Sequence, residues 1–119
     1  MGLFSKKKTT PTGMPYEEID SIEKARIEVE RGGLERIYII SPSLFGGSEG
    51  EDNVLYVPVG ISATKDQIDL DIVKQIQEGH NCSFNCQPEY KGRSVVPSKI
   101  VISYTCAGSM SIKKTLYCW

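Results

Sequence analysis

The stretch from 99 to 118 reads KIVISYTCAGSMSIKKTLYC, and one set of its apolar residues recurs at every second position. A period of two is typical of a β-strand with one buried face. A three-residue turn at 107–109 keeps this apolar set on a single face, whereas a two-residue turn does not. The stretch therefore predicts an antiparallel hairpin of defined register. Its inward pairs are Cys106 with Met110, Tyr104 with Ile112 and Ile100 with Leu116.

The preceding stretch, CSFNCQPEY at 82–90, alternates in the same way and predicts a third strand of the same meander. Its expected inward pairs are Cys82 with Cys106, Phe84 with Tyr104 and Cys86 with Ile102. Lys114 is the exception to the pattern, because it points inward on what becomes an edge strand. An inward charge at an edge opposes edge-to-edge aggregation.

Two stretches show helical periodicity. Residues 16–31 carry apolar residues on one stripe and end at Gly32 and Gly33. The second helix is predicted to begin at a capping box formed by Thr64 and Gln67. Its expected buried stripe is Ile68, Ile72, Val73 and Ile76, and its carboxylates Asp66, Asp69 and Asp71 are interpreted as a solvated face.

Residues 34–40 and 54–61 are rich in β-forming residues and predict two further strands. The second is apolar on both faces, which indicates cover on both sides or a central place in a sheet. Pro58 argues against the central place, because proline cannot donate to a strand ladder. With the order α-β-β-α-β-β-β, we predict an α+β two-layer sandwich: one mainly antiparallel five-stranded sheet with two helices on one face.

The chain has 119 residues and a formal charge of −1. This length predicts one α+β domain at 16–119, preceded by a flexible basic tail at 1–15. The balance of charges argues against a nucleic-acid partner. The N-terminal stretch lacks a signal-peptide pattern and the longest apolar run, 54–61, is too short to span a bilayer, so we predict a cytoplasmic protein without integral membrane association.

Four cysteines and His80 are the natural candidates for metal or thiol chemistry. In a cytoplasm the cysteines are expected as reduced thiols, mostly small buried residues of the core. Cys82 and Cys86 would lie about 13 Å apart on one strand, too far to share a zinc ion. Cys82 and Cys106 are the one pair expected to approach, as thiols in contact or as a disulfide formed on oxidation. A thiol-dependent enzyme or metal-binding protein that uses Cys82 with His80 or Cys106 is therefore the alternative hypothesis.

The loop at 41–53 is the strongest candidate for a functional element, because loops of this length are often functional. Its residues Leu44, Phe45, Gly46 and Gly47 either present an apolar tip to a partner or fold back as a plug. No coherent catalytic set and no cofactor motif is visible. The leading hypothesis is a small non-catalytic binding or self-association module, with a protein partner or a second copy of itself.

Overall fold

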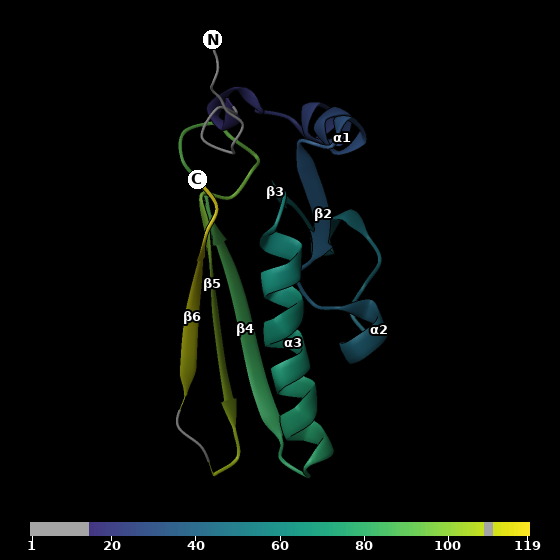
Figure 1. Ribbon diagram of the computed structural model, residues 1–119, viewed down its shortest axis with the longest axis vertical. Helices are drawn as coiled ribbons and strands as arrows, with labels where there is room; N and C mark the ends of the chain where they lie inside the picture. Colours follow the sequence, from purple (N-terminus) through teal and green to yellow (C-terminus); the bar gives the residue numbers. More distant parts are fainter. Residues whose placement is uncertain (1–14, 109–110) are drawn as a thin grey trace.

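The computed structural model describes residues 15–108 and 111–119 and has an α+β fold (Figure 1). Of the predicted tail at 1–15, all but Pro15 lies outside the described residues, as does the predicted pairing of Met110. The elements are η2 (Tyr16–Glu18), α1 (Ile22–Arg31), β2 (Leu34–Tyr38), α2 (Pro42–Phe45), η3 (Glu51–Asn53), β3 (Val54–Pro58), α3 (Ile61–Gln77), β4 (Cys82–Glu89), β5 (Lys99–Cys106) and β6 (Ile112–Tyr117).

The strands form two antiparallel sheets, β2-β3 and β4-β5-β6, so the prediction of a single five-stranded sheet was wrong. The reason lies in β3, all of whose residues are buried. Its residues Val54 and Tyr56 belong to one hydrophobic cluster, and Leu55 and Val57 to another. The β2-β3 pair therefore lies between two cores and does not extend the larger sheet. Pro58 fits because it is the last residue of β3.

The register of the three-stranded sheet was predicted correctly. Cys82 is opposite Cys106 in the β4-β5 pair, and Ile100 is opposite Leu116 in the β5-β6 pair. Tyr104 joins both pairs, with Phe84 on one side and Ile112 on the other. This register buries the apolar side chains of the sheet. A slip by one residue would expose them and bury the polar side chains instead.

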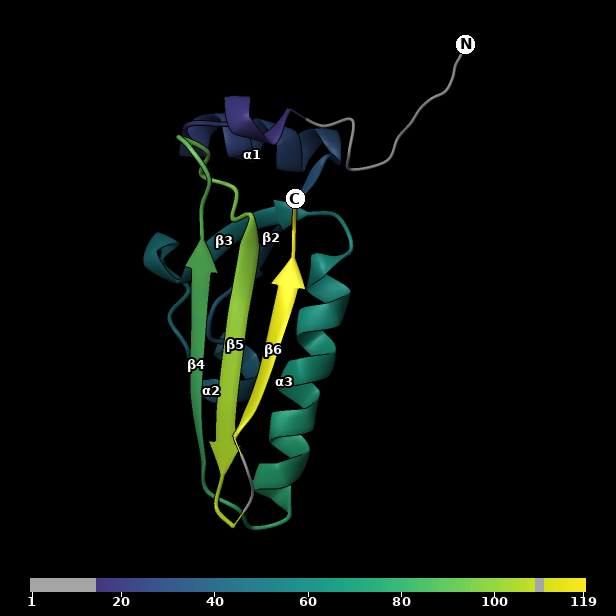
Figure 2. The same ribbon diagram turned by 90° about the vertical axis from the view of Figure 1, so that its left-hand side faces the viewer.

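Helices α1 and α3 contribute to different hydrophobic clusters, although both contact β2 and β3. Of the stripe predicted for α3, Ile68 and Ile72 are buried, whereas Ile76 is 46% exposed. Helix α3 lies along the inner face of the three-stranded sheet and also contacts β2 and β3 (Figure 1). Helix α1 crosses one end of the molecule and contacts β2 and β3 (Figure 2). The prediction of two helices on one face of one sheet therefore fails for α1, which covers the second core.

The first helix is shorter than predicted, and the second begins earlier. Ser21 caps α1 by accepting a hydrogen bond from the Lys24 N–H, and η2 precedes it as a separate turn. Helix α3 begins at Ile61 after Gly60, without the predicted Thr64 capping box. The Glu35 carboxylate instead accepts hydrogen bonds from the N–H groups of Gly60 and Ser62, at 3.0 and 3.1 Å. A residue 25 positions away thus replaces the local cap.

Candidate functional site

Cys82 and Cys106 form a disulfide across the β4-β5 pair. Of the two alternatives predicted for this pair, thiols in contact or a disulfide, the structure has the disulfide. The predicted register places the two residues directly opposite each other, with their Cα atoms 4.0 Å apart. In this state neither sulfur is a free nucleophile, so the thiol-based alternative requires prior reduction. His80 lies just before β4, and its backbone N–H donates to the Gln75 carbonyl oxygen.

The free cysteines of the described residues are Cys86 and Cys118. Burial raises the pKa of each thiol to about 11. Since the thiolate is the reactive form, neither residue has the character of an activated nucleophile at neutral pH. Residues 15–108 and 111–119 contain no group of three or more His, Cys, Asp or Glu side chains that could hold a metal ion.

The predicted contact loop at 41–53 contains two short helical segments, α2 and η3. Ser41 caps α2 by accepting from the Leu44 N–H, and Phe45 packs with its ring centroid 6.0 Å from that of Phe84. Phe45 thus folds back onto the sheet, while Leu44 remains 43% exposed. Gly46 adopts a φ of 72°, and a Cβ on Gly47 would lie 2.0 Å from the Ile40 carbonyl oxygen. The backbone of the loop therefore needs glycine at both positions. Because Phe45 also folds back onto the sheet, the loop fits the predicted plug better than the predicted exposed tip.

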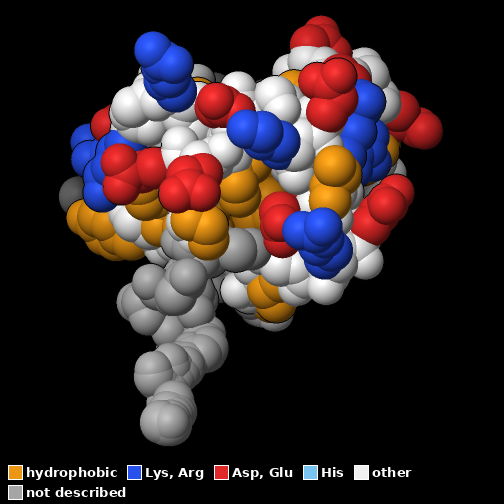
Figure 3. Space-filling model, turned by 90° about the horizontal axis from the view of Figure 1, so that it is seen from above, with side chains coloured by type: hydrophobic (Ala, Val, Ile, Leu, Met, Phe, Trp, Pro, Cys, Tyr) orange, Lys and Arg blue, Asp and Glu red, His pale blue; other side chains and the backbone are white. Residues whose placement is uncertain are grey.

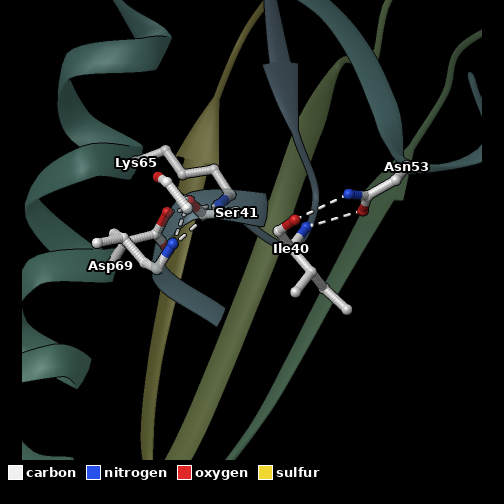
Figure 4. A network of polar contacts seen from close by, with 7 residues as sticks. Ile40, Ser41, Asn53, Lys65 and Asp69 are labelled. Carbon is white, nitrogen blue, oxygen red and sulfur yellow. Dashed lines mark hydrogen bonds and ion pairs between the residues drawn. The ribbon is translucent and has the colours of Figure 1, made fainter. Parts of the chain in front are cut away.

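Asn53 holds the ends of this loop together. Its side chain accepts a hydrogen bond from the Ile40 N–H at 2.9 Å and donates to the Ile40 carbonyl oxygen at 2.8 Å (Figure 4). It also donates to the Ser48 carbonyl oxygen at 2.6 Å. The buried Asn53 side chain thus satisfies backbone groups of Ile40 and Ser48 and fixes the path of the loop between them.

A buried ion pair joins Lys65 and Asp69 on α3, and the sequence did not reveal it. Its shortest N–O distance is 2.9 Å, and each side chain is 3% exposed. Figure 4 shows the pair pointing from the helix toward Ser41. Desolvation raises the pKa of Asp69, and the Lys65 ammonium opposes this shift by hydrogen bonding. The interpretation of Asp69 as part of a solvated face was wrong, because i and i+4 residues share the side of α3 that faces the β2-β3 pair and the sheet.

The described residues line several surface hollows, two of which have volumes of about 620 and 330 Å³. One, of about 330 Å³, lies between α1, β3 and the 90–95 segment, and its lining includes Ile22, Tyr56 and Tyr90. The Tyr56 hydroxyl donates to Glu51, and Arg26 pairs with Glu51 at 2.9 Å, so local partners satisfy these polar groups. Seen from the end of the molecule that α1 covers, hydrophobic side chains lie between acidic and basic ones (Figure 3).

The larger hollow, about 620 Å³, is a groove between α3 and β6. Ile68, Leu70 and Leu116 supply its apolar part, of which Leu70 is 51% exposed. Lys74 and Lys114 line it with their charges. Asp71 also lines it and accepts a hydrogen bond from the Tyr104 hydroxyl. The groove exists because α3 covers the inner face of β4 and β5 but leaves β6 partly uncovered; Ile112 is 38% exposed.

The outer edge of β6 is the most distinctive feature beside this groove. In the described part of the chain, β6 pairs with β5 alone. The Cys118 N–H donates to the Ser98 carbonyl oxygen, and successive strand residues direct their backbone groups to alternate edges. The N–H and C=O groups of Lys113, Thr115 and Tyr117 therefore point to the unpaired edge.

The edge of β4 differs from that of β6. The Ala107 N–H donates to the Asn81 carbonyl oxygen, and backbone groups alternate in direction along a strand. The residues of β4 whose backbone groups point away from β5 therefore include Pro88. Proline has no N–H to offer there. Phe45 from α2 also packs against Phe84 of the same strand. The sheet therefore has one blunted edge and one edge that retains its donors.

Sequence reasoning identified β6 as an edge strand with an inward Lys114 but did not reveal the groove. The groove depends on how far α3 reaches across the sheet, which no local pattern encodes. Comparison with known protein families and with curated proteins finds no match to this chain. No helix in the described residues is both long and apolar enough to cross a membrane.

Proposed function

We propose that the protein is a binding module that accepts an extended segment of another protein as a fourth strand beside β6. The observation that supports this most directly is the unpaired edge of β6, which adjoins a groove of about 620 Å³. Main-chain hydrogen bonds supply affinity in this type of recognition, and pockets for alternate side chains supply specificity. The groove offers such pockets on the inner face of the sheet.

A partner chain suits this edge better than a second copy does. Antiparallel self-pairing of β6 about Lys113 or Lys114 places lysines of the two copies opposite each other, and like charges on adjacent strands are destabilising. Edge lysines are a common protection against self-association. The homodimer is therefore the less favoured form of the proposal.

The cytoplasmic location remains part of the proposal and needs its own test, because disulfides persist mainly in oxidising compartments. The redox state of Cys82 and Cys106 in cells is the relevant measurement. Fully reduced cysteines after rapid alkylation of intact cells support the cytoplasm. A persistent disulfide indicates an oxidising compartment.

The test of the function is a selection of displayed random peptides on the wild type and on Thr115→Pro. This change removes one outward N–H of β6 but no hydrogen bond to β5, so the fold should persist. The matched control Thr115→Val retains the N–H. We expect peptides that bind the wild type and Thr115→Val but lose at least tenfold in affinity for Thr115→Pro. Selection of no such peptides, or equal binding to a folded Thr115→Pro variant, would contradict the proposal.

A further inference from the structure

Strand β6 carries two adjacent lysines, Lys113 and Lys114, beside the groove. Lys113 and Lys114 are consecutive, so their side chains point to opposite faces of the sheet. Lys114 lines the groove on the inner face, and Lys113 lies on the outer face opposite Ser103. Neither lysine forms an ion pair within residues 15–108 and 111–119, although five other basic residues there do.

The groove also places apolar residues near Lys114, on the inner face of the sheet. Leu116 is two residues beyond Lys114 and shares its face, and it lies in the groove with Ile68. On the other side, Ile112 lies on the same face and is 38% exposed. Leu116 is only 7% exposed, but Leu70 of α3 lines the same groove and is 51% exposed. A strand beside β6 therefore meets apolar surface from Ile112 on one side of Lys114 and from Leu70 across the groove.

We infer that the partner segment carries two consecutive acidic residues, one paired with Lys114 inside the groove and the other with Lys113 outside. Apolar residues lie two positions to either side of the acid that faces Lys114. This inference rests on the proposed strand addition. Cross-strand pairs of opposite charge stabilise a sheet, whereas like charges destabilise it. All pairs of the sheet are antiparallel, and an antiparallel partner that continues this arrangement has the pattern Val-Thr-Glu-Glu-Val.

Asp71 and Lys74 lie one turn apart on α3 at the same groove and largely offset each other in charge. The Tyr104 hydroxyl donates to Asp71 and so partly satisfies that carboxylate. Lys114 therefore leaves a positive balance at the groove. This balance favours an acidic residue at the central inward position.

The experiment is an NMR titration of the full chain with the capped peptide Ser-Val-Thr-Glu-Glu-Val-Ser and with its Gln-Gln and Lys-Lys counterparts. Perturbation of the β6 amides reports binding at the edge. We expect the Glu-Glu peptide to bind about tenfold more tightly than the Gln-Gln peptide, since two cross-strand charge pairs differ. The Lys-Lys peptide should bind least, and added salt should reduce the preference.

Variant proteins locate the effect. Lys113→Gln with Lys114→Gln should abolish the preference for the Glu-Glu peptide. Lys24→Gln with Arg31→Gln changes the net charge equally on α1. It should leave the preference intact, because α1 packs against β2 and β3 and lies across the end of the molecule opposite to the start of β6 (Figure 2).

Equal affinity for the Glu-Glu and Gln-Gln peptides would overturn this inference. Strand addition itself would then stand if Thr115→Pro abolished both. Absence of β6 perturbation by any of the three peptides also overturns the inference, and the random selection decides the proposed function independently. Concentration-dependent protection of β6 in the free protein would identify a second copy as the occupant and overturn it as well.

Discussion

At the scale of single residues, the least expected feature is the Lys65–Asp69 pair. Both side chains occupy positions on α3 that an amphipathic helix normally fills with apolar residues, while Leu70 is 51% exposed. The Lys65 ammonium also lies 5.8 Å from the centroid of the Phe84 ring. Two buried charges in this geometry depend on each other, because each compensates for the lost hydration of the other.

We therefore expect Asp69→Leu alone to lower the free energy of unfolding by about 3–5 kcal/mol, because it leaves a buried ammonium without its partner. The double variant Lys65→Met with Asp69→Leu should recover most of this loss, since it buries no charge. Urea denaturation of the two variants and the wild type measures both effects. A loss below about 1 kcal/mol for Asp69→Leu would show that Lys65 reaches solvent in solution.

At the scale of elements, the N-terminus of helix α3 is capped by a residue of strand β2. Its N-terminus follows Gly60, whose φ of 108° suits glycine, and has no cap from its own sequence. The Glu35 carboxylate of β2 accepts from two of its backbone N–H groups. A negative charge at this position also complements the helix dipole.

Replacement of Glu35 by Ala should lower the free energy of unfolding by about 1 kcal/mol, the usual cost of a lost N-cap. Glu35→Gln should cost less, because the amide oxygen still accepts a hydrogen bond but carries no charge. Chemical denaturation followed by circular dichroism measures both. Glu30→Ala on the exposed face of α1 is the matched control. An equal loss for Glu35→Ala and Glu30→Ala would refute the role of Glu35 as a cap.

At the scale of the whole molecule, the Cys82–Cys106 disulfide closes a covalent loop that includes the connection at 90–98. The two cysteines are 24 residues apart, at the end of the β4-β5 pair. Such a bond restricts the unfolded chain more than the folded sheet, in which the register already brings the two residues together.

Reduction should therefore lower the free energy of unfolding by about 2–4 kcal/mol while the sheet persists. Guanidinium denaturation with and without a phosphine reductant measures the change. The variant Cys82→Ala with Cys106→Ala should not respond to the reductant, because Cys86 and Cys118 are already free. A response of this variant equal to that of the wild type would show that the reductant acts elsewhere.

Much of the meander could be predicted from local pattern alone. Alternation from Cys82 to Leu116 assigned each inward residue and hence the register, because a slip by one residue exposes the whole apolar set. The contact between Cys82 and Cys106 followed from the same register. Of the candidate loop, the sequence located the segment but left open whether Phe45 points outward or folds back.

The sequence by itself thus determined the α+β class, the antiparallel meander and Lys114 as an inward charge on an edge strand. Only the tertiary structure decided that β2-β3 forms its own sheet, that Asp69 is buried and that a groove lies between α3 and β6. The physical reason is that periodicity reports whether a side chain is buried but not which element covers it. That choice depends on contacts between residues far apart in the chain, such as Glu35 with Gly60.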